Sequence, residues 1–111
     1  MGNSQESHHN FAYRVLTLLP DSPGALSGLR PYLDFILYNP EDNDGELFSE
    51  YLFRQLNLEI TLKVYDMITQ TVRNVQVKPM KLINCANYLG AELRFECFEY
   101  AHFYTFLLNE I

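Results

Sequence analysis

The sequence predicts a small, mainly β domain with two helices, arranged as a partly open β-barrel. Three observations lead to this prediction. The chain of 111 residues is long enough for one compact domain and too short for two. Hydrophobic residues make up 48% of it, which rules out disorder of the whole chain. Most of the apolar residues alternate with polar ones at a period of two, as in strands, and only two short stretches carry helix signals.

The first part of the domain is expected to fold as strand, helix and strand. Residues 11–18 alternate in polarity and predict a strand that stops at Pro20. Pro23 follows an Asp-Ser pair that can cap a helix, so a short helix is expected over residues 23–27. The apolar run 33–38 ends at an Asn-Pro pair and predicts a central strand.

A second, longer helix is expected after a polar loop. Residues 41–46 are charged or polar and contain a glycine, so they predict a solvated loop. Apolar residues then recur at spacings of three to five over residues 47–56, the pattern of an amphipathic helix of about three turns. Acidic residues at its start and Arg54 near its end agree with the helix dipole.

The remainder of the domain is expected to be strands. Residues 60–65 and 71–78 predict a β-hairpin, and residues 80–90 predict a connecting loop. Residues 91–98 then alternate cleanly, so Ala91, Leu93, Phe95 and Cys97 are expected to face the core. Residues 103–108 are apolar on both faces and predict a last strand.

Composition excludes several classes of function. The net charge is -6, and the eight basic residues are scattered, which disfavours a nucleic-acid partner. No apolar run approaches the roughly 20 residues of a membrane-spanning helix, and the N-terminus lacks the apolar core of a secretory signal. The default compartment is therefore the cytosol. Cys85 and Cys97 form no CxxC pair, which argues against a zinc site or a disulfide framework.

The residues offer poor material for catalysis. His8 and His9 lie in the polar tail, His102 lies near the C-terminus, and no serine or cysteine has an obvious base beside it. The acidic residues of the 41–46 loop lack the ligand spacing of a calcium-binding EF-hand. We therefore expect no enzyme activity, no cofactor and no metal site.

A short segment before the clean strand offers a binding chemistry instead. If the backbone amides of Leu89, Gly90 and Ala91 converge, they form a nest that can hold a carboxylate. The following strand would then offer its edge to an extended peptide, and the longer helix would supply the second wall. The alternative reading is that Gly90 only permits a tight turn and that strand and helix simply pack together.

Longer motifs resemble one known family. Residues 22–36 (SPGALSGLRPYLDFI) closely resemble the S-P-A-x-x-A-G-L-x-P-(Y/F)-x-D block of the Golgi reassembly stacking proteins, or GRASP proteins. Residues 60–66, 75–79 and 89–95 resemble the later K-L-x-V, V-x-V-x-P and L-G-x-S-I-R-F motifs of that family, in the same order. The resemblance covers residues 15–98 and implies a PDZ domain that is circularly permuted, so that the carboxylate-binding loop and its strand come late in the chain.

The resemblance implies a peptide-binding site and its partners. The site would combine the amides of Leu89, Gly90 and Ala91, the strand side chains Leu93 and Phe95, and the helix side chains Phe48, Tyr51 and Leu52. In the family this groove takes C-terminal or internal hydrophobic peptides of golgin coiled-coil tethers, of transmembrane cargo tails or of a second copy of the protein. Self-association in trans then links membranes at the cytoplasmic face of the Golgi.

Two features set this chain apart from the family pattern. The family precedes its loop with Trp-Gly-Gly-x-Gly, whereas this chain has Ile-Asn-Cys-Ala-Asn over residues 83–87. The histidines on the family's opening strand are replaced by Arg14 and Leu16, so no zinc-assisted partner binding is expected.

The family resemblance also bears on the two ends of the chain. Family members carry a myristoyl group on Gly2, which is present here inside an expected flexible tail over residues 1–10, although Glu6 stands where the lipidation pattern wants Ser or Thr. A single myristoyl chain binds membranes weakly, so a membrane-bound partner would have to supply a second signal. The PDZ domain is expected over residues 11–100, and residues 101–111 are a candidate start of a second PDZ domain.

Two rival functions stay open at the level of sequence. One is a PDZ adaptor elsewhere in the cytosol, and the other is the PDZ-like regulatory domain of a protease. For the groove itself, the sequence predicts that Gly90→Val abolishes peptide binding with only a modest loss of stability, because a branched side chain would block the approach of a ligand backbone.

Overall fold

The computed structural model describes residues 9–83 and 87–99, and only the backbone at the outer ends of the first and last strands. In chain order its elements are β2 (His9–Leu18), α1 (Pro23–Leu26), β3 (Asp34–Leu37), the 3-10 helix η2 (Pro40–Asn43), α2 (Phe48–Arg54), β4 (Ile60–Asp66), β5 (Thr71–Val77) and β6 (Ala91–Glu99). Three predictions lie outside the described residues: the strand over residues 103–108, the candidate domain start over residues 101–111 and the lipidation site Gly2. For Cys97 only the backbone is described, so the predicted direction of its side chain stays a prediction.

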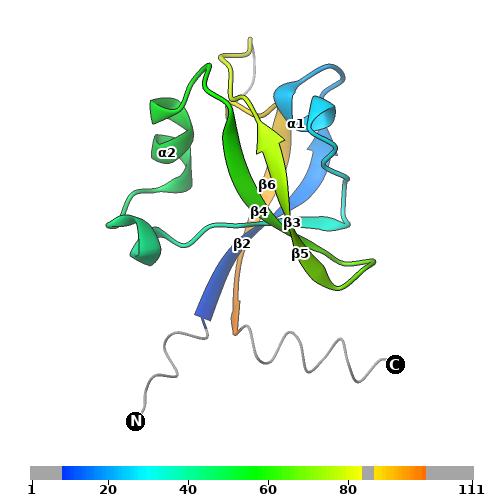
Figure 1. The fold of residues 1–111 in the computed structure, drawn as a ribbon, viewed down its shortest axis with the longest axis vertical. Helices are drawn as coiled ribbons and strands as arrows, with labels where there is room; N and C mark the ends of the chain where they lie inside the picture. Colours follow the sequence, from blue (N-terminus) through cyan, green and yellow to red (C-terminus); the bar gives the residue numbers. More distant parts are fainter. Residues whose placement is uncertain (1–8, 84–86, 100–111) are drawn as a thin grey trace.

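The described strands form one antiparallel sheet of five, in the order β5-β4-β3-β2-β6 (Figure 1). The sheet is open, with β5 at one edge and β6 at the other. The prediction of a mainly β, partly open fold with two helices is therefore confirmed. β2 and β6 form the longest pairing, from His9 opposite Glu99 to Leu18 opposite Ala91, with an irregularity between Val15 and Thr17.

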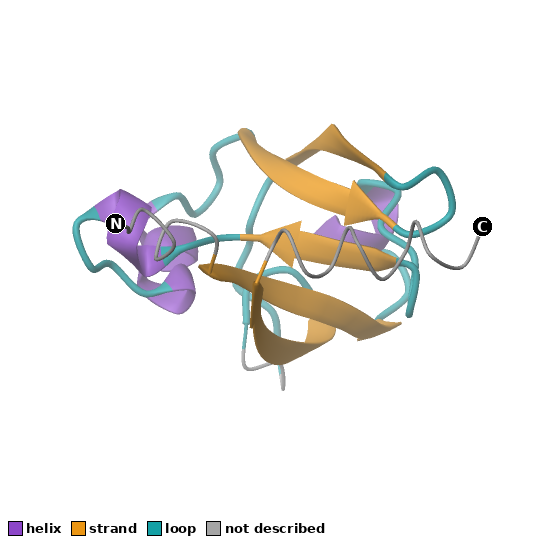
Figure 2. Cartoon of the chain, turned by 90° about the horizontal axis from the view of Figure 1, so that it is seen from below, coloured by secondary structure: helices purple, strands orange, loops and turns teal. Residues whose placement is uncertain are grey.

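The two helices lie apart from each other. In Figure 1, α2 stands to one side of the strands and α1 lies near the upper end on the other side, and Figure 2 shows the same separation from below. The Oγ atom of Ser22 accepts a hydrogen bond from the Ala25 N–H at 3.2 Å and caps α1, and Pro23 occupies its first turn. These are the signals from which the short helix was predicted.

The longer helix is shorter than predicted, at seven residues. The Glu50 carboxylate accepts the Leu47 N–H at 3.0 Å and so helps to start it. Beyond Arg54, the Leu56 N–H donates to the Phe53 carbonyl and the Leu58 N–H to the Gln55 carbonyl, which are bonds to the third residue back. The apolar spacing continues to Leu56, but the backbone has already left α-helical geometry.

The predicted polar loop before α2 begins with a single turn of 3-10 helix, η2. The Asn39 Oδ1 atom accepts the Glu41 N–H at 2.9 Å, and Pro40 occupies the first helical position. Asp44 then ends the turn with a left-handed backbone (φ 56°). Asn, Pro and Asp thus specify a short helical turn even though most of the segment is exposed.

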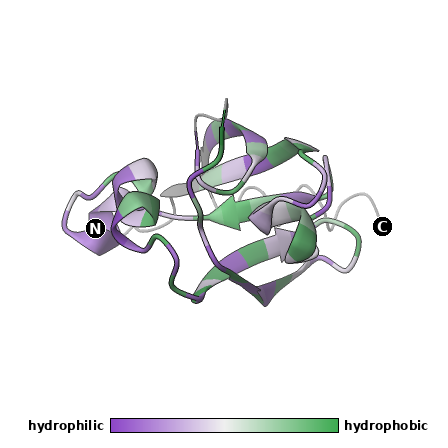
Figure 3. Ribbon diagram, turned by 90° about the horizontal axis from the view of Figure 1, so that it is seen from above, coloured by the Kyte–Doolittle hydropathy of each residue, from purple (hydrophilic) through white to green (hydrophobic). Residues whose placement is uncertain are grey.

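The core lies between the inner face of the sheet and α2. Hydrophobic and hydrophilic bands alternate along the strands (Figure 3), and a second, smaller buried cluster of Ala12, Phe35 and Tyr65 lies on the opposite face of the sheet from the main one. The central buried cluster consists of Val15, Leu29, Ile36, Tyr38, Phe48, Leu52, Ile60, Leu62, Val64, Val75, Val77, Leu89 and Ala91. It includes residues of α2 and of the Leu89–Ala91 segment, so the core fixes these two parts of the chain relative to each other.

Candidate functional site

A groove lies between α2 and the first half of β6. It encloses a pocket of about 290 Å³. Its lining comes from β2, from the start and middle of α2, from β6 and from the loop that precedes β6. The lining residues are Tyr13, Leu47, Phe48, Ser49, Leu52, Asn87, Leu93 and Phe95. Four of the residues that the family resemblance implies for a peptide site therefore meet here, namely Phe48, Leu52, Leu93 and Phe95.

Aromatic rings form much of the floor of this groove. The Tyr13 ring stacks on Phe48 with 4.8 Å between centroids, and it also contacts Phe95 at 5.1 Å. Phe48 and Leu52 are buried, with 3% and 0% of their surface exposed. Burial also raises the pKa of the Tyr13 hydroxyl above its ordinary value, so this group stays neutral at physiological pH. The floor is therefore apolar, uncharged and rigidly supported by the core.

Phe95 departs from the prediction that it faces a closed core. Its surface is 48% exposed, whereas Ala91 on the same face of β6 is buried. The reason is that β6 is an edge strand of the described sheet, and Phe95 meets Tyr13 on one side and the open groove on the other. A large exposed aromatic ring inside a groove is apolar surface that a ligand can cover.

The loop before β6 brings three backbone amides together. The N–H groups of Leu89, Gly90 and Ala91 donate to one atom, Asn87 Oδ1, at 2.9, 3.1 and 3.3 Å. Gly90 has a left-handed backbone (φ +74°), which allows successive N–H groups to point into one concavity. The loop thus has the shape of an anion-binding nest, and in this structure the side chain of Asn87 fills it.

Backbone hydrogen bonds hold this loop in place from outside. The Gly24 N–H in α1 donates to the Leu89 carbonyl at 2.7 Å, and the Leu19 N–H donates to the Gly90 carbonyl at 2.8 Å. A Cβ atom on Gly24 would lie 2.9 Å from that Leu89 oxygen, so the close approach requires glycine. The motif of residues 22–36 therefore supports the loop even though it lies far from it in the sequence.

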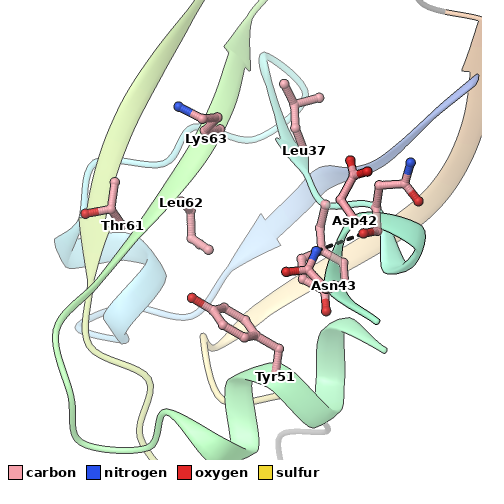
Figure 4. Close-up of a pocket in the computed structure, with 9 residues that line it drawn as sticks. Leu37, Asp42, Asn43, Tyr51, Thr61, Leu62 and Lys63 are labelled. Carbon is pink, nitrogen blue, oxygen red and sulfur yellow. Dashed lines mark hydrogen bonds between the residues drawn. The ribbon is translucent and has the colours of Figure 1, made fainter. Parts of the chain in front are cut away.

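Tyr51, which the family resemblance places in the groove, lies elsewhere. It lines a second pocket of about 430 Å³ between η2 and β4, where its ring is directed toward Leu62 (Figure 4). The Arg54 guanidinium lies over the Tyr51 ring at 5.5 Å, and Tyr38 contacts it at 5.7 Å. Tyr51 directly precedes Leu52, and consecutive residues of a helix point about 100° apart, so Tyr51 faces β4 while Leu52 lines the groove.

Leu89 contributes to the groove through its backbone only, because its side chain is fully buried in the core. Sequence reasoning did not include Tyr13, Leu47, Ser49 or Asn87 in the site. A signal existed for Asn87, because asparagine side chains often bond to backbone N–H groups two or three residues later. A third pocket, of about 320 Å³, lies next to α1 and includes the exposed side chains of Leu26 and Met80.

Within residues 9–83 and 87–99, no group of three or more His, Cys, Asp or Glu side chains is placed to hold a metal ion. In the same part of the chain, no helix is both long and apolar enough to cross a bilayer.

Comparison with known proteins agrees with this geometry. Residues 2–99 match the family described as GRASP55/65 PDZ-like domain. The chain is 31% identical over 84 residues to human Golgi reassembly-stacking protein 1, and equally so to the mouse protein. These matches cover 73% of this chain and 19% of each relative, so the chain corresponds to less than a fifth of their length.

Proposed function

The chain belongs to the GRASP55/65 PDZ-like domain family, and on that premise we propose that it is a non-catalytic peptide-binding module that tethers Golgi membranes. The observation that carries the proposal is the groove between α2 and β6. The exposed side chain of Phe95 lies in this groove, and β6 itself is an edge strand of the described sheet. This combination of an apolar groove and a strand edge is what an extended peptide requires.

The proposed mode of binding is strand addition. A peptide would lie alongside β6 and continue the sheet through backbone hydrogen bonds, which supply affinity with little dependence on sequence. Alternate side chains of the peptide would enter the groove, where Tyr13, Phe48 and Leu93 would contact them. Because the floor is aromatic and uncharged, the groove is expected to select apolar side chains.

The proposed partners are golgin tethers, the tails of transmembrane cargo and a second copy of the chain. Binding between copies on opposed membranes would link those membranes in trans. The chain would act as a peripheral protein at the cytoplasmic face of the Golgi, with a myristoyl group on Gly2 as one anchor. A bound partner would supply the second anchor, because one acyl chain gives only reversible binding.

The first test is an NMR titration of the chain with a hydrophobic golgin peptide. Binding as proposed shifts backbone signals of Leu93 and Phe95 on β6 and of Phe48 on α2. Shifts confined to the pocket lined by Tyr51, or to the pocket beside α1, would place the peptide elsewhere. The absence of shifts with golgin, cargo and self-derived peptides would contradict the proposal.

A matched pair of variants separates the groove from general surface effects. Phe95→Glu puts a charge into the groove, and we expect peptide affinity to fall at least about tenfold, since the carboxylate must be desolvated by the ligand. Ile68→Glu makes the same change in the turn between β4 and β5, the two strands farthest from β6 in the sheet, and Ile68 is 64% exposed there. Equal losses in both variants would contradict the groove assignment.

Tethering needs its own experiment. The chain is attached by its N-terminus to two populations of vesicles, and clustering is followed by light scattering. We expect clustering that the soluble golgin peptide competes away, because both would use the same groove. Clustering that is unaffected by the peptide and by Phe95→Glu would assign self-association to another surface.

A further inference from the structure

The nest before β6 is filled by a side chain of the protein itself. A PDZ-type nest offers its N–H groups to a ligand carboxylate. Here the N–H groups of Leu89, Gly90 and Ala91 already donate to Asn87 Oδ1, within 2.9 to 3.3 Å. The place of a ligand carboxylate oxygen is therefore taken by the neutral oxygen of an asparagine amide.

Both ends of the Asn87 amide are engaged, which fixes its orientation. Three N–H donors surround one end, and only the oxygen can accept from them. The other end, Nδ2, donates to the carbonyl oxygen of Ala91. The amide thus connects the loop to the first residue of β6, and rotating it would break bonds at both ends.

We propose that Asn87 is a specificity-determining residue that excludes a free C-terminal carboxylate, so that the groove binds an internal, extended apolar segment of its partner. This inference rests on the proposed peptide-binding function. A terminal carboxylate would have to displace the Asn87 side chain. The hydrogen bonds that it accepted from the three nest amides would only replace the three that Asn87 Oδ1 accepts now. An internal segment has no such charge to place, and it can pair with β6 and fill the apolar groove while the nest stays closed.

The chain's charge points the same way. Its net charge is -6, and the Glu92 carboxylate directly follows the nest residues, where it accepts a hydrogen bond from Thr17. Among the residues that line the groove, none is basic. A ligand carboxylate would thus find no cationic partner in the groove lining and would rely on the three amides alone.

The test compares the wild-type chain with Asn87→Gly, which removes the amide and leaves the nest open. The probe is one apolar peptide, alternating in polarity, made with a free C-terminal carboxylate and with a C-terminal amide. We expect the wild type to bind both forms within about twofold. We expect Asn87→Gly to prefer the free carboxylate by about tenfold, the size of charge-assisted hydrogen bonds to an open nest.

Asn39→Gly is the matched control. Asn39 also caps a turn by accepting a backbone N–H, that of Glu41, but it lies outside the groove lining. It should leave the ratio of the two affinities unchanged. If Asn87→Gly does not fold, Asn87→Ala removes the same hydrogen bonds with less backbone freedom.

Several results would overturn the proposal. A wild-type chain that prefers the free carboxylate by about tenfold or more would show that Asn87 does not block the nest. An Asn87→Gly variant without such a preference would show that Asn87 is not what determines specificity. A failure of both proteins to bind either peptide would count against the proposed function itself, and the nest is then tested separately with acetate.

In the acetate titration, amide signals of Leu89, Gly90 and Ala91 should shift saturably in Asn87→Gly and remain unchanged in the wild type. Equal shifts in both proteins, or shifts in neither, would overturn the role of Asn87 whatever the outcome with peptides.

Discussion

Arg73 and Asp34 form a two-pronged ion pair that crosses strand β4. The Arg73 Nη2 atom lies 2.8 Å from Asp34 Oδ2, and Nη1 lies 3.0 Å from Oδ1. Asp34 is fully buried at the start of β3, while Arg73 belongs to β5, two strands away in the sheet. Arg30 also donates to Asp34, at 3.1 Å, and contacts Asp66 at 2.7 Å. These four charges link β3, β4 and β5 to the segment that precedes β3.

Asp34→Asn is expected to destabilise the domain by about 3 kcal/mol, near the lower end for breaking a buried ion pair. The loss of stability is expected near this lower end because Arg73 and Arg30 keep 31% and 38% of their side-chain surface exposed, so water can hydrate both guanidinium groups after the substitution. Urea unfolding measures the difference. Glu46→Gln removes a carboxylate from the exposed pair with Arg54 and serves as the control, with little effect expected.

The same charges predict how stability depends on pH. Burial raises the pKa of Asp34, but the hydrogen bonds from Arg73 and Arg30 outweigh it and leave the pKa below its ordinary value of 3.8. Burial also raises the pKa of Asp66, but hydrogen bonds from the Thr69 N–H and from Arg30 outweigh this effect and leave the pKa of Asp66 below its ordinary value.

A carboxylate with a lowered pKa stabilises the fold above its unfolded pKa, near about 3.9, and this contribution is lost as the pH falls through the folded pKa. We therefore expect the free energy of unfolding to drop below about pH 4 in the wild type, and to drop less in Asp34→Asn. Unfolding curves at a series of pH values measure both. A difference between the two proteins that stays constant from neutral to acidic pH would contradict the assignment.

The elements of this fold could be predicted because their signals are local. Alternation marked the strands, and the Ser-Pro cap marked α1, since these patterns depend on neighbours within a few residues. The length of α2 was overestimated because the apolar spacing continues past Arg54. The helix ends there through backbone hydrogen bonds to the third residue back, and such bonds do not alter the pattern of apolar residues.

The candidate site was harder to predict because its decisive contacts are long-range or unusual. The alternation of β6 suggested that Phe95 is inside, but whether a face is covered depends on the position of the strand in the sheet. The bond that holds the loop before β6 joins the Gly24 N–H to the Leu89 carbonyl, and these two residues lie far apart in the sequence. Asn87 entered the sequence analysis as part of a departure from a glycine-rich pattern. The tendency of asparagine to bond to N–H groups two or three residues later does not by itself show that one side-chain oxygen accepts from all three nest amides.

Leu52→Ala is expected to cost about 2 to 5 kcal/mol of stability, because Leu52 is fully buried and its truncation leaves a cavity between α2 and the sheet. Peptide affinity should fall as well, since the same side chain lines the groove. Leu58→Ala is the matched control. Leu58 is 56% exposed in the segment before β4, so its stability should change by no more than about 0.5 kcal/mol. Similar losses in both variants, measured by urea unfolding, would show that the core is misassigned.

Gly90 is a structural residue as well as part of the nest, and this corrects the expectation that Gly90→Val causes only a modest loss of stability. A Cβ atom at Gly90 would lie 2.2 Å from the Cβ atom of Ser22 and 2.7 Å from its Oγ atom. Ser22 is buried and caps α1, so it has little room to move. Substitution at Gly90 therefore disturbs the support of the loop before any ligand is present.

Gly90→Ala, compared with Gly45→Ala, separates this clash from backbone strain. Both glycines have left-handed backbones, with φ of +74° and +81°, but a Cβ atom at Gly45 would meet nothing within 4 Å. Gly45→Ala should therefore lose only the strain of about 1 to 2 kcal/mol. Gly90→Ala adds the clash with Ser22 and should lose on the order of 4 kcal/mol or more. Urea unfolding measures the loss of stability in both variants. Equal losses would mean that Ser22 moves to make room for the added Cβ atom and that the loop is not held tightly against α1.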